Sequence, residues 1–148
     1  MGEARVEIVD PGGERWGAVM EYAGRCPWRA GPFLAKRMRQ NALSGWERVF
    51  AAVEGGEIAG FCTLSETDFN PESGHTPYIG FVFVGEGYRG NRLSQRLIRR
   101  ALDYAKTLDF QSVYLTSGER GLYEKYGFRK LDDAARPDGE ESLYVISI

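Results

Sequence analysis

The sequence has few residues of the kinds that build metal centres or disulfide frameworks. Its 148 residues include two cysteines, Cys26 and Cys62, and one histidine, His75. Two thiols make no disulfide framework, and with a single histidine they make no set of metal ligands. We therefore expect reduced structural thiols and no bound metal.

Long apolar runs and an excess of charge are also lacking. The longest stretch without acidic or basic side chains, around residues 73–85, is broken by Pro77 and Gly80 and is shorter than the ~18 residues of a membrane-spanning helix. No apolar signal segment follows Met1, so we expect a cytoplasmic protein with no membrane partner. The net charge of −2 argues against nucleic acid as a partner.

What the sequence does contain is enough apolar material for a buried core. Hydrophobic residues make up 43% and charged residues 27% of the chain, which is an ordinary globular composition. A typical domain has ~150 residues, and the chain shows no repeat and no long linker. We therefore expect residues 1–148 to form a single domain.

Hydrophobic periodicity and turn residues predict an alternation of strands and helices. Strands are expected at residues 5–9, 48–54, 57–64, 78–84, 112–116 and 143–146, and helices at 14–25, 33–42, 92–108 and 118–126. The Gly55-Gly56 pair predicts a hairpin between the second and third strands. The strand at 78–84 is apolar throughout, which favours a central position covered on both faces. Because helices alternate with strands but a hairpin also occurs, we expect a mixed sheet of the α+β or α/β class.

The segment at 84–95 connects this apolar strand to the longest predicted helix. The start of a helix presents unpaired backbone N–H groups and the positive end of the helix dipole. Arg89 and Arg92 add positive charge there, whereas Arg96 and Arg99 fall on the polar face of the helix, where we expect them to be solvated. The segment therefore predicts a site for a phosphorylated ligand, with a simple solvated turn as the alternative.

Three glycines in this segment allow a different interpretation. Gly85, Gly87 and Gly90 match the glycine pattern of dinucleotide-binding sites. That pattern normally opens a longer domain than the chain after Gly90 can form. The acidic residue about twenty positions on, Asp109, precedes the next predicted strand instead of ending it. An NAD-dependent oxidoreductase is therefore the least favoured function.

Starting at Arg89, the same segment has the spacing Arg89-x-x-Arg92-x-Ser94. It resembles the signature of the GNAT acetyltransferase superfamily, which is Arg or Gln, two residues, Gly, one residue, and Gly or Ala, after a β-strand. The chain departs from this signature at Arg92 and Ser94, which replace the two glycines. The resemblance implies a three-layer fold, with a central mixed, mostly antiparallel sheet flanked by helices, and an acyl-CoA ligand.

The resemblance also implies roles for individual residues. In that family the amides of this turn hold the CoA pyrophosphate, and the preceding strand bonds the pantetheine arm. The matching residues of this chain are Phe81, Val82, Phe83, Val84, Arg89, Gly90, Asn91, Arg92, Leu93, Ser94 and Gln95. A second segment, 121–128, resembles the family's pattern of an apolar residue, Tyr, variable positions and Gly-Phe. It implies that Tyr123 is the general acid that protonates the leaving CoA thiolate, while Tyr126 takes a core position.

Acyl transfer to an amine needs the amine in its neutral form, so a base is expected near the acceptor. For a lysine-like amine, deprotonation at pH 7 costs about 4–5 kcal/mol. Glu66 and Asp68 follow the strand at 57–64 and share one face by the two-residue period. Either carboxylate can steer a cationic amine and take its proton. His75 is a third candidate.

The resulting hypothesis is an N-acyltransferase that uses acetyl-CoA, without a metal, to acetylate a small-molecule or peptide amine. The amine attacks the thioester directly, because neither cysteine has an activating motif for a covalent relay. The replaced glycines motivate the alternative of a non-catalytic acyl-CoA-binding sensor. Trp16, Trp28, Phe33 and Trp46 fall where the acceptor side would be covered, and we expect one or two of them to line its pocket. The sequence leaves a homodimer open.

Overall fold

The fold is defined by a computed structural model that describes residues 4–43, 45–67, 74–90, 92–117, 119, 121–131 and 142–148. Along the chain its elements are β1 (Arg5–Val9), α1 (Trp16–Arg25), α2 (Gly31–Arg39), β2 (Arg48–Glu54), β3 (Glu57–Ser65), β4 (Tyr78–Val84), the short 3₁₀ helix η2 (Glu86–Tyr88), α3 (Leu93–Thr107), β5 (Ser112–Ser117), α4 (Leu122–Lys125), β6 (Arg129–Leu131) and β7 (Ser142–Ser147). The sequence does not predict β6, because two of its three residues are exposed and show no alternation.

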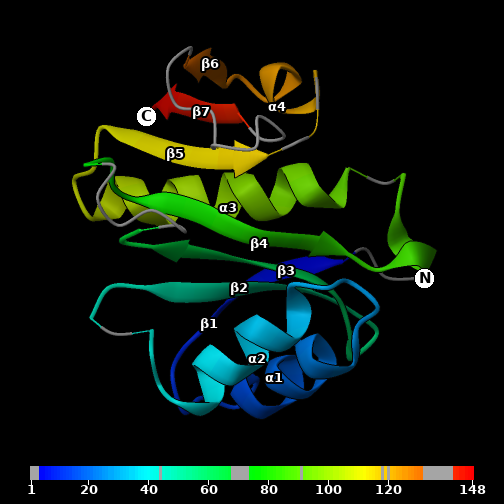
Figure 1. Cartoon of the computed structure of the whole chain (residues 1–148). Helices are drawn as coiled ribbons and strands as arrows, with labels where there is room; N and C mark the ends of the chain where they lie inside the picture. The colour runs from blue at the N-terminus through cyan, green and yellow to red at the C-terminus, as the bar shows by residue number, and fades with distance from the viewer. Residues whose placement is uncertain are drawn as a thin grey trace.

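The strands form one sheet in the order β1-β2-β3-β4-β5-β7-β6 (Figure 1). The pairing of β4 with β5 is parallel, and the other neighbouring pairs are antiparallel. The expected mixed, mostly antiparallel sheet is therefore confirmed. The β2–β3 hairpin is also confirmed: Gly55 and Gly56 have φ angles of 59° and 83°, which glycine adopts without steric cost.

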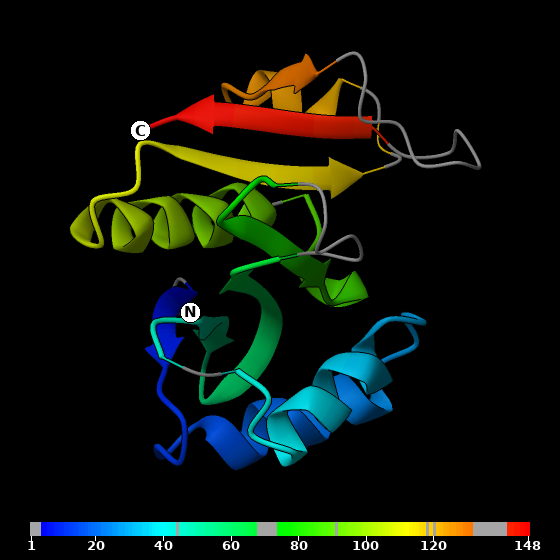
Figure 2. The same ribbon diagram turned by 60° about the vertical axis from the view of Figure 1, so that its left-hand side comes forward.

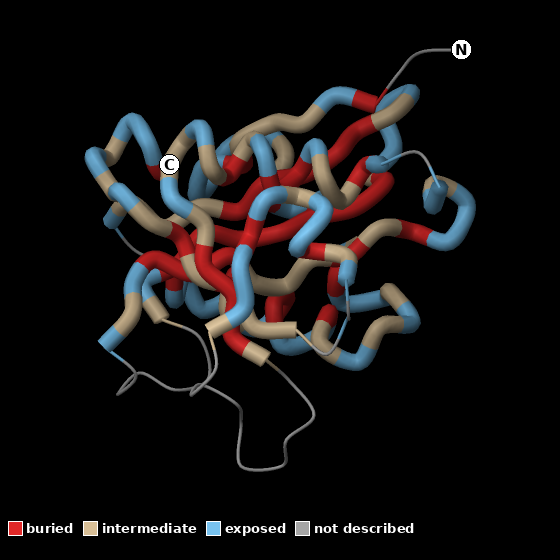
Figure 3. Tube along the Cα trace, turned by 90° about the horizontal axis from the view of Figure 1, so that it is seen from above, coloured by how far each residue is buried: buried red, intermediate tan, exposed pale blue. Residues whose placement is uncertain are grey.

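Alternation along the strands buries both faces of the sheet. On β2, Val49, Ala51 and Val53 belong to one apolar cluster together with α1 and α2, whereas Phe50 and Ala52 belong to a second cluster with α3. Figure 2 shows α1 and α2 lying together, with strands between them and α3. In Figure 3 the buried segments run through the middle of the molecule and the exposed ones surround them. The three-layer arrangement follows from these two cores.

The helices follow the predicted periodicity, with some shifts of their ends. On α3 the buried residues share one face of the helix: Leu93, Leu97, Ile98, Ala101 and Ala105. The second helix is predicted at 33–42 but runs from Gly31 to Arg39. Pro32 is tolerated in its first turn, and the chain leaves the helix at Asn41, which has a φ of 52°.

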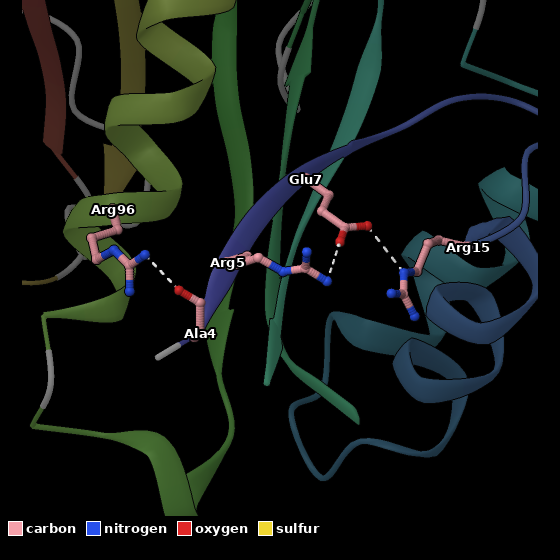
Figure 4. A network of polar contacts seen from close by, with 5 residues as sticks. All are labelled: Ala4, Arg5, Glu7, Arg15 and Arg96. Carbon is pink, nitrogen blue, oxygen red and sulfur yellow. Dashed lines mark hydrogen bonds and ion pairs between the residues drawn. The ribbon is translucent and has the colours of Figure 1, made fainter. Parts of the chain in front are cut away.

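A polar network fixes the edge strand β1 to both helical layers (Figure 4). The Arg96 guanidinium on α3 donates to the carbonyl oxygen of Ala4, just before β1. On β1 itself, Glu7 forms ion pairs with Arg5 at 3.5 Å and with Arg15 at 3.0 Å, the latter just before α1. The expectation that Arg96 is merely solvated is therefore wrong, because its side chain ties α3 to the start of the sheet.

The centre of β4 departs from regular strand geometry. Phe81 has a φ of 51°, and the register between β3 and β4 shifts at this point. Such a bulge places an extra residue on one strand and bends it. Gly60 on β3 allows the close approach, because a Cβ there would lie 2.5 Å from the carbonyl oxygen of Phe83. The bend turns the second half of β4 away from β5.

The pairing of β4 with β5 is accordingly short. It consists of Tyr78 opposite Tyr114, supported by a 2.9 Å hydrogen bond from the Tyr114 amide to the Pro77 carbonyl. Beyond that point the strands diverge, and Gly80, Phe81 and Val82 are half-buried. The expectation of a strand fully covered on both faces is wrong here, because the middle of β4 lines open space.

Two general features complete the description. Within the described ranges, no helix is long and apolar enough to cross a membrane. In the same part of the chain, no group of three or more histidine, cysteine, aspartate or glutamate side chains is placed to hold a metal ion. The cytoplasmic location stays a prediction.

Candidate active site

A long cleft begins where β4 and β5 diverge and extends to the start of α3; we call it the β4–α3 cleft. Its volume is about 950 Å³. Its wall is formed by Pro27, Trp28, Val82, Phe83, Val84, Arg89, Gly90, Arg92, Leu93, Ser94, Ser117, Glu119, Leu122, Tyr123 and Tyr126. Most of the residues predicted to bind the CoA therefore line a single cleft.

Two of the predicted CoA-binding residues line other spaces, and a third is not described. Phe81 lines a neighbouring cavity on the other side of β4's bend. Gln95 lies in the first turn of α3 but lines a small depression between α3 and β7. Asn91 lies outside the described residues.

The start of α3 presents backbone donors at one end of the cleft. The first hydrogen bond of the helix runs from the Arg96 amide to the Arg92 carbonyl. The amides of Leu93, Ser94 and Gln95 therefore have no partner within the helix. Such a helix start, together with its dipole, is a site for an anionic group such as a phosphate.

Arg92 stands immediately before this helix in the left-handed conformation, with φ 57° and ψ 27°. This conformation costs a non-glycine residue about 1–2 kcal/mol. It is the conformation that glycine adopts without strain, and glycine is what the family signature has at this position. The departure from the signature therefore places an arginine in a conformation that suits glycine, and Arg92 lines the cleft.

The other arginine of the motif is held against β4. The Arg89 Nε donates to the Val84 carbonyl at 3.1 Å, and its guanidinium lies 5.9 Å from the centre of the Phe83 ring. The Nε–H of Arg89 is therefore occupied by the last residue of β4. The guanidinium still borders the cleft.

Tyr126 links the start of α3 to α4. Its hydroxyl lies 2.8 Å from the Ser94 Oγ, and either atom can donate. The expectation of a core position for Tyr126 is only partly right, because the residue is half-buried and lines the cleft. No sequence signal identifies this contact, since the two residues are far apart along the chain.

Tyr123 on α4 lies between the β4–α3 cleft and a second cavity, and lines both. It is 6% exposed, and its ring packs against Tyr126, Phe128 and Tyr144. Burial raises the pKa of the phenol to about 12, and the nearby Tyr126 and Glu119 contribute in the same direction, against a hydrogen bond with Ser117. The hydroxyl therefore stays protonated far above neutral pH.

The second cavity lies between α2, the end of β3 and the two diverging strands; we call it the aromatic cavity. Its volume is about 610 Å³. Its wall is formed by Trp28, Ala30, Phe33, Arg37, Thr63, Ser65, Thr67, Tyr78, Ile79, Gly80, Phe81, Val82, Leu115, Thr116, Ser117 and Tyr123. Trp28, Val82, Ser117 and Tyr123 border both spaces, so the two meet at this point.

The aromatic residues from the helical region divide into two groups. Trp28 stacks on Phe83 with ring centres 5.7 Å apart, and Phe33 is 63% exposed at the cavity wall. Trp16, the first residue of α1, is buried in the core, and Trp46 packs on Phe110 and lines neither space. Two of the four residues named from the sequence thus line the aromatic cavity.

The two predicted bases that the structure describes, Glu66 and His75, do not line the aromatic cavity. Glu66 is exposed and lines neither space; its amide donates to the Glu47 carboxylate at 2.7 Å. The His75 ring lies against Tyr114, with ring centres 4.5 Å apart, and also lines neither space. Asp68 lies outside the described residues, although Thr67, directly before it, lines the aromatic cavity.

The dinucleotide interpretation finds little support in the topology. Dinucleotide-binding domains have a mostly parallel sheet, with a helix that opens at the glycine-rich turn itself. Here β4 and β5 form the single parallel pair among the described strands. The turn after β4 enters η2, and α3 begins only at Leu93.

Comparison with known proteins gives one family. A profile described as the acetyltransferase (GNAT) family matches residues 16–128. Among curated proteins, the N-acetyltransferase YhbS of Escherichia coli (strain K12), described as uncharacterized, is 28% identical over 94 residues. This match covers 62% of the present chain and 56% of that protein, so the chain spans little more than half the length of this relative.

Solved structures with the same fold cover nearly the whole chain. The Escherichia coli YhbS protein in complex with CoA has a TM-score of 0.74 at 21% identity, covering 98% of this chain and 81% of that one. An acyl-CoA N-acyltransferase from Pseudomonas aeruginosa has a TM-score of 0.68 at 19% identity, covering 97% and 99%. An acetyltransferase from Streptococcus agalactiae has a TM-score of 0.67 at 18% identity, covering 100% of both chains.

Proposed function

Because the chain belongs to the acetyltransferase (GNAT) family, we propose that it transfers an acyl group from acyl-CoA, with acetyl-CoA as the simplest donor, to an amine. The observation that carries the proposal is the divergence of β4 from β5 after a single residue pair, with the start of α3 at one end of the opening and Tyr123 beside it. This arrangement leaves strand backbone and helix amides facing one continuous cleft.

The donor occupies the β4–α3 cleft in this proposal. The pantetheine arm bonds to the backbone of β4 between Phe81 and Val84, where the neighbouring strand has moved away. The pyrophosphate lies at the amides of Leu93, Ser94 and Gln95, with the Arg92 guanidinium beside it. Several amides and a guanidinium on one diphosphate provide charge-assisted hydrogen bonds, which are about twice as strong as neutral ones.

The acceptor enters through the aromatic cavity and meets the thioester near Tyr123. The amine nitrogen attacks the thioester carbon, a C–N bond forms and the C–S bond breaks. The sulfur leaves as a thiolate and ends as the free thiol, while the nitrogen loses one proton to a base. We retain Asp68 as the proposed base, because it follows Thr67, which lines this cavity.

The raised pKa of Tyr123 defines what its hydroxyl can do. An ordinary thiol has a pKa of about 8.5, so a phenol with a pKa of about 12 keeps its proton more tightly than the leaving sulfur does. A complete transfer that leaves a tyrosinate costs about 5 kcal/mol. Tyr123 therefore acts first as a hydrogen-bond donor to the charge that develops on sulfur, and its proton moves only if another proton replaces it.

The test is thiol release from acetyl-CoA in the presence of a panel of amines, with mass spectrometry of the acylated product. Release that depends on both an amine and the protein supports the proposed transfer. If the protein binds acetyl-CoA but releases no CoA thiol with any of the amines, the result would instead favour the non-catalytic sensor. The choice of base is tested with two variants, Asp68→Asn and Glu66→Gln. We expect Asp68→Asn to lose turnover at neutral pH and Glu66→Gln to keep it.

A further inference from the structure

Arg37 is the feature of the aromatic cavity that the proposed function does not use. It lies in the last turn of α2 and is half-buried, and it lines the aromatic cavity but not the β4–α3 cleft. Among the described residues in the cavity wall it is the one with a charged side chain. The donor cannot account for it, because the donor occupies the other space.

Within the described part of the chain, the Arg37 guanidinium has no hydrogen-bond or ion-pair partner. Four ion pairs occur among the described residues, formed by Arg5, Arg15, Arg25 and Arg48, and no hydrogen bond or ion pair involves the Arg37 side chain. Its backbone carbonyl accepts from the Ala42 amide at 2.8 Å, which fixes the end of the helix but not the side chain. A partly desolvated cation without a partner is unfavourable, and an anion that binds there restores the lost solvation.

Resting on the proposed function, we propose that the acceptor amine also carries a carboxylate, and that Arg37 binds this carboxylate. The planar guanidinium presents paired N–H donors that match the two oxygens of a carboxylate. With the carboxylate held at Arg37 and the reacting nitrogen near Tyr123, the acceptor spans the aromatic cavity from its α2 wall to its junction with the cleft.

The remaining wall defines the body of this acceptor. Trp28, Phe33 and Phe81 offer aromatic surface, and Phe33 is unusually exposed for a large apolar residue, at 63%. Thr63 and Ser65 donate their hydroxyl protons to the carbonyls of Gly80 and Thr67, at 3.2 Å and 2.9 Å. Their oxygens can still accept a hydrogen bond. The substrate class is therefore a small amino acid-like amine with an apolar or aromatic body.

The test uses pairs of bisubstrate probes, so that turnover is not needed. In one probe, CoA is joined through its sulfur and an acetyl bridge to the nitrogen of phenylalanine; in the other, to phenylalaninamide, which lacks the negative charge. A second pair carries glycine and glycinamide. Dissociation constants are measured by calorimetry for the wild type, Arg37→Gln and the control Lys36→Gln, which changes an exposed neighbour outside the cavity.

We expect the carboxylate probe of each pair to bind about tenfold more tightly than its amide to the wild type and to Lys36→Gln, as one charge-assisted contact implies. In Arg37→Gln the ratio falls to about one, while the affinity for CoA itself is unchanged. Equal affinities of carboxylate and amide probes in the wild type, or an unchanged ratio in Arg37→Gln, would overturn the inference and leave the proposed function intact. Failure of the wild type to bind CoA would overturn the proposed function and the inference with it.

Discussion

The β4–α3 cleft and the aromatic cavity meet at Tyr123 but are built in different ways. The cleft depends on backbone: a bulge at Phe81, the divergence of two strands and the first amides of α3. The cavity depends more on side chains, contributed by α2, the segment after α1, the end of β3, β4, β5 and α4. A site built from backbone groups is expected to depend less on side-chain identity, whereas a site built from side chains is expected to change its specificity with each substitution.

This difference separates two parts of the proposed reaction. In the proposed reaction, the donor is held mainly by backbone groups of β4 and α3. The acceptor is selected there by side chains such as Arg37 and Trp28. Substitutions in the cleft are therefore expected to alter donor affinity and stability, and substitutions in the cavity to alter the choice of acceptor.

The largest effect is expected at the junction, for Tyr123→Phe. The change removes one hydroxyl that faces the leaving sulfur, so turnover should fall about 10²–10³-fold while the acetyl-CoA dissociation constant changes less than about twofold. Steady-state thiol release and calorimetry measure the two quantities. The matched control is Tyr126→Phe, which removes the contact to Ser94 and should weaken donor binding more than it slows turnover. Equal turnover of the wild type and Tyr123→Phe would contradict the proposed role.

The same tyrosine predicts a loss of stability at alkaline pH. Burial raises its pKa from 10 to about 12. Below pH 10 the phenol is neutral in the folded and the unfolded chain; between about pH 10 and pH 12 the unfolded chain ionises first, and the stability falls by up to about 2.7 kcal/mol. Urea unfolding of wild type and Tyr123→Phe across this range measures the difference. If the free energies of unfolding of the two proteins change in parallel from pH 9 to pH 12, Tyr123 is not a buried phenol with a raised pKa.

The bulge in β4 is tested by Gly60→Ala. A Cβ at this position would lie 2.5 Å from the Phe83 carbonyl oxygen and 3.2 Å from the Val84 Cα, so β4 has to move. We expect a loss of about 2 kcal/mol in stability and weaker acetyl-CoA binding, because the same stretch of β4 lines the cleft.

The control for Gly60→Ala has the opposite sign. Gly17 is an exposed glycine of α1 with no atom within 4 Å of an added Cβ. Gly17→Ala should therefore stabilise the protein by up to about 1 kcal/mol and leave donor binding unchanged. Thermal unfolding measures the stability of both variants, and calorimetry measures their affinity for acetyl-CoA. If Gly60→Ala changes neither quantity, the bulge does not need this close approach.

The smallest effects are expected at Arg92. Arg92→Ala and Arg92→Gly both remove the guanidinium and should weaken acetyl-CoA binding about fivefold at low salt, with a smaller loss at high salt. Arg92→Gly should in addition be more stable than Arg92→Ala by about 1 kcal/mol, because only glycine adopts a φ of 57° without strain. Comparable stabilities of the two variants would argue against the left-handed turn.

The contrast between the two spaces also explains what the sequence predicts. The Gly55-Gly56 hairpin, the apolar strand at 78–84 and the start of α3 have local signals, and the turn motif together with Tyr123 locates the cleft. The bulge has no such signal, because its left-handed residue is Phe81, where a glycine would be expected. Local patterns are therefore sufficient for most of the cleft but not for its bend.

The aromatic cavity is less predictable for a physical reason. Its members are distant in sequence and come together only through tertiary packing, so Arg37 on α2 gives no local sign of facing β4. Glu66 satisfies the spacing expected of a base, yet it is exposed just after the buried end of β3 and lines neither space. Alternation predicts the face of a strand but not what covers the residues beyond its end.

The most direct test of the acyl-CoA site is thermal unfolding of the protein with acetyl-CoA, CoA, NAD or no ligand. A ligand at a hundred times its dissociation constant adds about 2.7 kcal/mol to the free energy of unfolding, which raises Tm by roughly 5–10 °C for a domain of this size. We expect such a rise with acetyl-CoA and with CoA, and none with NAD. A rise with NAD alone would contradict the assignment of the β4–α3 cleft to acyl-CoA.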